Sequence, residues 1–212
     1  MNANDLIQYF KPKFNCRLPN SVLNLGEAEW FLEDHPGQDY NPHIDWDVYL
    51  PKYNRNLQRP FVWSIEQKAE LIKSILRDIE IAPLTIVQVR DRRAEHPLVW
   101  QIIDGKQRFS SILSYLRGEF PITVEGEEFY YNDLPDELQK KIKWFDVRAY
   151  VVYHNIYHNT DNLTDRERLR ETVTDDDRIE LYLYINYAGV PQDEQYLKDL
   201  ADTVDFNKHT NA

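Results

Sequence analysis

The stretch Val99-Trp100-Gln101-Ile102-Ile103-Asp104-Gly105-Lys106-Gln107-Arg108 decides how the middle of this 212-residue chain folds. Its first half is a short apolar run rich in β-forming residues, which is typical of a buried strand. The Asp104-Gly105 pair predicts a sharp turn. The apolar residues that follow repeat with helical spacing, and Gly118 is placed to end that helix: Phe109, Ile112, Leu113 and Leu116. We therefore expect a buried strand that turns directly into an amphipathic helix.

A junction of this kind is suited to binding phosphate. The start of a helix offers unpaired backbone N–H groups and the positive end of the helix dipole, and Gly105 lets a ligand approach the backbone. Lys106 and Arg108 lie in the first turn, where cations are unfavourable unless an anion neutralises them. The alternative is that Asp104 caps the helix and both cations face water. Spacing alone does not decide between these interpretations.

The elements around the junction predict an α+β domain. A helix begins at Ser64, an N-cap candidate matched by Gln67, and its apolar residues continue to Ile79. Leu84–Val89 and Leu98–Ile103 are predicted to be two strands of one sheet. The remaining predicted elements are a hairpin around Glu125-Gly126, a helix from Asp133 to about Trp144, a strand at Val147–Tyr153, and helices at Arg178–Tyr187 and Asp193–Val204.

The first 45 residues have a different character. Proline and glycine recur through them, so residues 1–45 predict an irregular N-terminal arm laid over the core, with one short helical candidate at Glu27–Glu33. Residues 46–63 contain Pro51 and Pro60, which favour an extended loop. We expect one globular domain at residues 46–212, preceded by this arm.

Composition bounds the partners and the compartment. The chain is 42% hydrophobic, which is enough to form a core. Its net charge is −11, so any contact with DNA has to be made through a local basic pocket. The single Cys16 fits a reducing compartment. We find no signal pattern and no stretch near the ~20 apolar residues that cross a bilayer. These features predict a cytoplasmic protein without a membrane partner; the oligomeric state stays open.

Three motifs in a fixed order carry a resemblance to a known family. They are R-P-F-V-W at Arg59–Trp63, I-D-G-K-Q-R at Ile103–Arg108, and Leu183–Pro191 with its I-N-Y-A-G-V-P. Together they resemble the D-G-Q-Q-R family, which includes the amino-terminal domains of GmrSD-type modification-dependent restriction enzymes and of SspE-type phage-defence proteins. The resemblance spans roughly residues 46–200. It implies a small mixed sheet flanked by helices, similar to ParB and sulfiredoxin.

The resemblance also implies which residues bind a nucleotide. Asp104, Gly105, Gln107 and Arg108 would form the phosphate motif, and Lys106 replaces the first glutamine of the family pattern. The replacement adds a cation, but it removes an amide acceptor.

Three further residues are implied around the same pocket. Arg59 and Gln58 would project toward it, and Asn186 would lie nearby if the carboxyl-terminal helix closes over it. The structural alternatives are ion pairing at a strand end for Arg59 and helix capping for Asn186.

Relatives of this type look like nucleoside-triphosphate hydrolases. By that resemblance Arg108 and Arg59 would stabilise charge on the transferring phosphoryl group, while Asp104 would orient water or hold Mg²⁺. The chain has no G-x-x-x-x-G-K-[ST] loop, so a P-loop enzyme is excluded. The function predicted first is therefore a nucleotide-binding domain that hydrolyses a nucleoside triphosphate in DNA restriction, phage defence or counter-defence.

Two other functions stay open. The first is a DNA nuclease of ParB-like fold, although the sequence holds no H-N-H-like cluster. The second is a non-enzymatic acidic inhibitor or decoy that binds a host or effector protein, which the charge of −11 favours. His154 and His158 are four residues apart, but the polar residues around them favour a loop over a metal site. We predict no resident metal ligand set.

Overall fold

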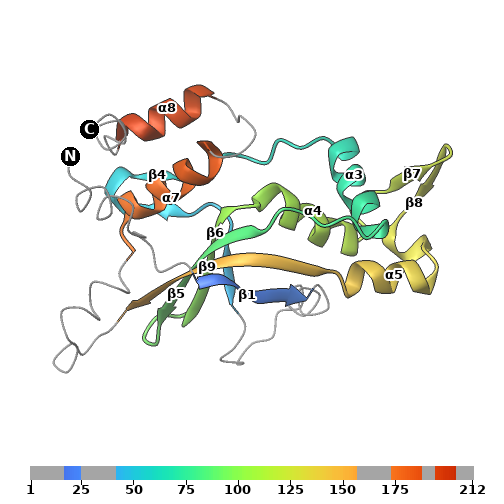
Figure 1. Ribbon diagram of the computed structural model, residues 1–212, viewed down its shortest axis with the longest axis horizontal. Coiled ribbons are helices and arrows are strands. Elements are labelled where there is room, and N and C mark those ends of the chain that lie inside the picture. Colours follow the sequence, from blue (N-terminus) through green and yellow to red (C-terminus); the bar gives the residue numbers. More distant parts are fainter. Residues whose placement is uncertain (1–16, 25–41, 157–172, 188–193, 204–212) are drawn as a thin grey trace, which may run out of the picture.

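The computed structural model describes residues 17–24, 42–156, 173–187 and 194–203. Their centre is a five-stranded mixed sheet with the strand order β1-β9-β5-β6-β2 (Figure 1). Strand β1 (Arg17–Asn24) is antiparallel to β9 (Asp146–Ile156), which is parallel to β5 (Leu84–Asp91). Strand β5 is antiparallel to β6 (Leu98–Asp104), and β6 is parallel to β2 (His43–Asp45). Together with the helices around it, this sheet confirms the predicted α+β class.

Five helices and two small hairpins complete the described part of the chain. The helices are α3 (Ile65–Leu76), α4 (Lys106–Leu116), α5 (Asp136–Lys143), α7 (Asp175–Tyr187) and α8 (Glu194–Thr203). The hairpins pair β3 (Tyr49–Leu50) with β4 (Arg55–Asn56), and β7 (Ile122–Val124) with β8 (Glu127–Phe129). Short 3-10 turns lie at η1 (Pro51–Tyr53) and η2 (Tyr131–Asp133).

Two strands of the main sheet come from the segment predicted to be an irregular arm. Strand β1 forms one edge of the sheet and β2 forms the other. The prediction of an irregular arm did not anticipate these two strands. Both strands are added by pairing with distant partners, β9 and β6, and such pairing leaves little local pattern. The helical candidate at Glu27–Glu33 lies outside the described residues.

Helix α3 begins as predicted and ends one turn early. The Ser64 side chain accepts from the Gln67 N–H at 3.3 Å, and the Gln67 side chain accepts from the Ser64 N–H at 2.9 Å, which completes a capping box. The helix stops at Leu76 because Asp78 adopts a left-handed conformation with φ of 58°. Ile79, expected on its buried face, is therefore outside the helix and exposed.

The sheet separates two hydrophobic clusters. Neighbouring residues of a strand point to opposite faces, so Ile86 and Val87 belong to different clusters, as do Ile102 and Ile103. The first cluster takes buried residues from α3, α4 and α5, including Ile72, Ile112 and Ile142. The second takes buried residues from α7, α8 and the segment before α3, including Ile179, Leu200 and Leu57.

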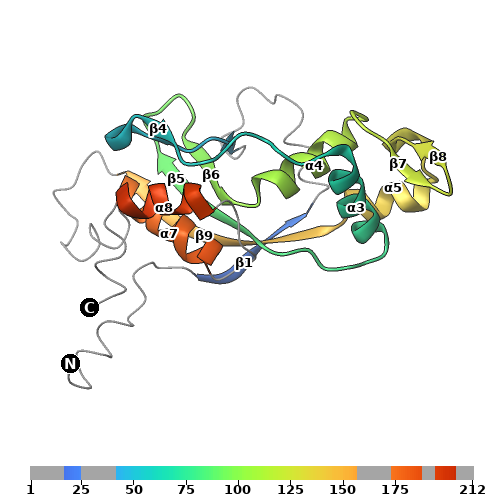
Figure 2. The same ribbon diagram turned by 90° about the horizontal axis from the view of Figure 1, so that it is seen from above.

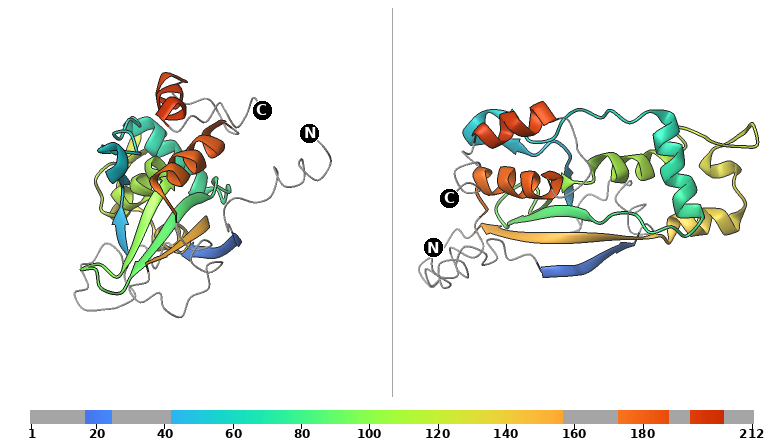
Figure 3. Two further views of the ribbon diagram at one scale, coloured as in Figure 1. Left: turned by 90° about the vertical axis from the view of Figure 1, so that its left-hand side faces the viewer. Right: turned by 45° about the horizontal axis from the view of Figure 1, so that its top comes forward.

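The helices divide along the length of the sheet. Helices α7 and α8 lie side by side at one end, and α3, α5 and the β7–β8 hairpin lie at the other (Figures 2 and 3). Helix α4 lies between them, directly after β6. This arrangement leaves the β6–α4 junction near the middle of the molecule. None of the described helices combines the length and the apolar character that a membrane span requires.

Candidate phosphate-binding site

Gly105 makes the turn between β6 and α4. Its φ is +95°, in the left-handed region that favours glycine, and it is the N-cap residue of α4. A Cβ atom at this position would lie 2.2 Å from Leu84 Cδ2. No side chain caps the start of α4, so the expectation that Asp104 might serve only as a helix cap is wrong. The predicted strand, turn and helix are all confirmed.

Asp104 instead pairs with Arg108 one turn along. Arg108 Nη2 donates to Asp104 Oδ2 at 2.8 Å and to the Pro83 carbonyl at 3.1 Å. Both side chains are 21% exposed, so the pair is largely screened from water. The Nε atom of Arg108 is buried and donates to no partner. Arg108 therefore places a fixed guanidinium group beside the uncapped start of α4, and the Nε–H of this group is an unpaired hydrogen-bond donor.

Lys106 faces the segment before α3 rather than open solvent. Its Nζ donates to Asp47 Oδ1 at 2.7 Å and to the Arg59 carbonyl at 3.4 Å. The Lys106 side chain is 12% exposed, whereas that of Asp47 is 59% exposed. Because Asp47 reaches into water, it can turn away at small cost and leave the buried ammonium group to another anion.

The two predicted glutamines hold this segment against the junction. Gln58 Nε2 donates to the Ile102 carbonyl at 2.7 Å and to the Ile103 carbonyl at 2.6 Å. Gln107 Oε1 accepts from the backbone N–H groups of Val62 at 3.1 Å and Trp63 at 3.2 Å. These contacts place the R-P-F-V-W motif directly beside the D-G-K-Q-R motif. A direct contact of either glutamine with a nucleotide stays a prediction.

Tyr182 connects α7 to the same site. It is 2% exposed, and burial, with smaller contributions from nearby Tyr196 and Asp104, raises its pKa to about 12, while Arg59 acts in the opposite direction. Both Arg59 and Asp104 therefore lie within electrostatic reach of one buried hydroxyl group. Arg59 also lowers the pKa of Tyr196, whose net pKa is raised by burial.

Asn186 lies one helical turn beyond Tyr182 and is 5% exposed. Its Nδ2 donates to the Tyr182 carbonyl at 2.7 Å. This bond runs back within α7 to the residue four positions earlier, so it is not a cap of the helix end. Asn186 thus bonds to Tyr182, the residue that senses the charges of Arg59 and Asp104, and a role of Asn186 in binding a nucleotide stays a prediction.

Sequence reasoning missed three residues of this site. Asp47 and Tyr196 have no motif around them, and each meets the site only through the fold: Tyr196 Oη donates to the Leu57 carbonyl, and Asp47 pairs with Lys106. Tyr182 carried one usable signal, because it lies four residues before Asn186 and so shares a helix face with it.

A second polar network fastens α7 to the sheet next to the site. Arg178 is 7% exposed, and its Nε donates to Gln101 Oε1 at 2.7 Å. Gln101 Nε2 donates in turn to Asp45 Oδ2 at 3.1 Å. Arg178 Nη2 lies 3.2 Å from His154 Nδ1. His154, weighed above as a metal ligand, therefore contacts a buried guanidinium, and His158 lies outside the described residues.

This network predicts a pH-dependent stability. Burial, assisted by the Arg178 charge, lowers the pKa of His154 from 6.5 to about 4. Between these values the unfolded chain binds a proton on His154 and the folded protein does not. The free energy of unfolding should therefore fall by roughly 1–3 kcal/mol as the pH drops through this window. Denaturation at several pH values measures this; a His154→Asn variant should lose that part of the slope, and an unchanged slope would contradict the prediction.

Comparison with known proteins supplies the family. The family model described as the GmrSD restriction endonuclease, N-terminal domain, matches residues 43–200. The match begins at the first residue of β2 and ends within α8, so it contains all three motifs. No curated protein and no solved structure matched the chain. Because the family model covers well over half of the sequence, this chain belongs to the family of GmrSD restriction endonuclease N-terminal domains.

Proposed function

We propose that this chain binds a nucleoside triphosphate at the β6–α4 junction and hydrolyses it in the course of DNA restriction or phage defence. Membership of the GmrSD family supports the setting, since the family name is that of a restriction endonuclease. The observation that carries the nucleotide site is Arg108, whose buried Nε lacks a partner beside an uncapped helix start. A phosphate oxygen satisfies both kinds of donor.

The charges around the junction suit a ligand that is more negative than the side chains now present. Lys106, Arg108 and Arg59 bring three cations, and Asp47 and Asp104 are the carboxylates paired with two of them. A polyphosphate would replace Asp47 on Lys106 and extend the contacts of Arg108. In the transition state Arg108 and Arg59 would stabilise the charge on the transferring group.

Asp104 is the carboxylate best placed to hold a magnesium ion. Only one of its oxygens is engaged by Arg108, and the side chain is partly exposed. An oxygen donor of this kind fits Mg²⁺, which would supply further neutralisation of the phosphate charge. Otherwise Asp104 orients Arg108, since the ion pair fixes the guanidinium across one helical turn.

The test is direct measurement with each common triphosphate and Mg²⁺. We expect saturable binding by calorimetry and phosphate release above the buffer rate for at least one triphosphate, with or without duplex DNA. A complete absence of binding and release across the panel would contradict the proposal.

Cleavage of DNA is a second candidate, and the family name favours it. Supercoiled plasmid incubated with Mg²⁺ or Mn²⁺ and a triphosphate would report nicking as a change in gel mobility. Nicking that is lost in an Asp104→Asn variant would assign the cleavage to this site. Plasmid that stays supercoiled in every condition would contradict this candidate for the chain by itself.

A further inference from the structure

The last two residues of β5 and the turn that joins it to β6, together called the 90–96 turn, carry three arginines that have no carboxylate partner among the described residues. Arg90, Arg92 and Arg93 are exposed, and in the part of the chain that the structure describes none of them forms an ion pair. Cations at the other end of the molecule behave differently. Lys73, Lys141, Arg117 and Arg148 each lie within ion-pair distance of a carboxylate.

The turn is well ordered by its own hydrogen bonds. Asp91 Oδ1 accepts from the Arg93 N–H at 2.9 Å, and the Asp91 N–H donates to the Pro97 carbonyl at 3.0 Å. His96 stacks on His43 of β2, with ring centroids 4.3 Å apart and an interplanar angle of 10°. The arginines are thus presented on a braced turn at the end of two inner strands of the sheet, and less backbone conformational entropy is lost when they bind.

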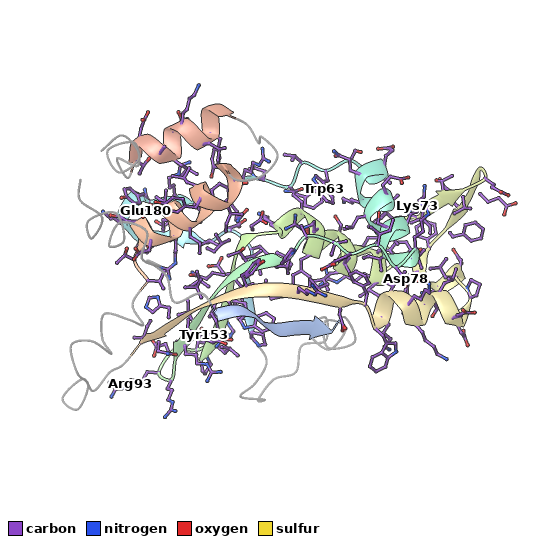
Figure 4. The ribbon with its side chains drawn as sticks, in the orientation of Figure 1. Trp63, Lys73, Asp78, Arg93, Tyr153 and Glu180 are labelled. Carbon is purple, nitrogen blue, oxygen red and sulfur yellow. The ribbon has the colours of Figure 1, made fainter. Side chains whose placement is uncertain are left out.

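The position of the turn separates it from the phosphate site. Figure 4 shows Arg93 at the opposite end of the sheet from Lys73 and far from Trp63, which adjoins the D-G-K-Q-R motif. Strand β6 runs from Leu98, beside the turn, to Asp104, so its two ends are about 20 Å apart. The three arginines therefore cannot contact the same phosphates as Arg108.

We infer that the 90–96 turn contacts the backbone phosphates of DNA. This rests on the proposed function in DNA restriction. A guanidinium group matches a phosphate in a bidentate geometry, and arginine is favoured over lysine for this reason. The chain as a whole has a charge of −11, so long-range attraction cannot bring it to DNA. Three exposed arginines against two carboxylates, Asp91 and Glu95, leave the 90–96 turn with a net positive charge, which is what such a protein needs for a local contact.

The experiment compares two variants that remove the same charge. The turn variant combines Arg90→Ala, Arg92→Ala and Arg93→Ala. The control combines Arg77→Ala, Arg117→Ala and Lys140→Ala, three exposed cations at the far end of the molecule. Binding of a labelled 30-base-pair duplex of mixed sequence is followed by fluorescence anisotropy at several NaCl concentrations.

We expect the turn variant to bind at least tenfold more weakly than the wild-type chain. Its slope of log affinity against log salt should be smaller by about 2 to 3, since each lost phosphate contact removes about 0.9. The control variant should stay within twofold of the wild type. All six residues are exposed, so both variants should keep the wild-type melting temperature, and both should keep triphosphate binding.

The possible outcomes separate this inference from the proposed function. Equal loss of DNA binding in both variants, or in neither, would overturn the inference while leaving the nucleotide site intact. If the wild-type chain bound no duplex at low salt, both the inference and the proposed role in DNA restriction would be overturned. The proposed triphosphate site would be unaffected. If the turn variant lost affinity for polyglutamate by the same factor as for DNA, the assignment to DNA would be overturned. The turn would then be a site for any polyanion.

Discussion

Substituting Gly105 with alanine should lower the free energy of unfolding by about 2–6 kcal/mol. Two costs add at this position. Its φ of +95° lies in a region that costs an L-residue about 1–3 kcal/mol, and the new Cβ would lie 2.2 Å from Leu84 Cδ2. Leu84 is fully buried, so relieving the clash forces overpacking of the core, worth about 1–3 kcal/mol. Denaturant unfolding followed by circular dichroism measures the sum.

Gly118 is the matched control. It also has a positive φ, of +72°, but an added Cβ would meet nothing within 4 Å. Gly118→Ala should therefore cost only the backbone term, about 1–2 kcal/mol. Equal losses in the two variants would show that packing against Leu84 contributes nothing. In a double-mutant cycle, Leu84→Ala should lower the free energy of unfolding less in the Gly105→Ala background than in the wild type, because it removes the side chain that clashes.

Replacing Arg108 with alanine should reduce phosphate release by roughly 10²–10³-fold. Removing one fixed donor from a site that stabilises developing charge has an effect of this size. Triphosphate binding should weaken as well, because Arg108 supplies the buried Nε beside the helix start. Initial rates and calorimetric affinities of the same preparation measure both effects.

Controls are needed because Arg108 also supports the fold. Without it, Asp104 would keep a partly buried carboxylate with no ion pair. Arg108→Lys retains the charge, and should therefore fold while recovering only part of the rate, since lysine lacks the forked geometry. Arg117→Ala removes an exposed cation just past the end of α4 and should leave rate and affinity unchanged. Wild-type activity in a folded Arg108→Ala protein would sink the proposed site.

Structural features that depend on a few consecutive residues could be predicted from the sequence. Ser64 and Gln67 predict the start of α3 because a capping box is a contact between residues three apart. Asp104-Gly105 predicts the turn, since the backbone there needs the left-handed conformation that glycine adopts. The three ordered motifs were enough to identify the family, which the match over residues 43–200 confirms.

The roles of the side chains within the site were not predictable in the same way. Gln58 and Gln107 fit the motif equally well as nucleotide ligands, but their hydrogen bonds join segments about 45 residues apart. The sequence places the positive charge of Lys106 in the first turn of α4 but does not show what neutralises it. Its partner, Asp47, lies 59 residues earlier in the chain. Such contacts leave no periodicity and no spacing to detect.

The amino-acid sequence by itself determined the β6–α4 junction, the start of α3 and the family, because each depends on local backbone preference or on a short contiguous motif. The tertiary structure alone decided that β1 and β2 join the sheet, and that Arg178 joins α7 to Gln101. It also decided that Gln58 and Gln107 hold the segment before α3 against the β6–α4 junction. The physical reason is that strand pairing and buried polar contacts are chosen among distant partners by the packing of the whole core, which no local stretch encodes.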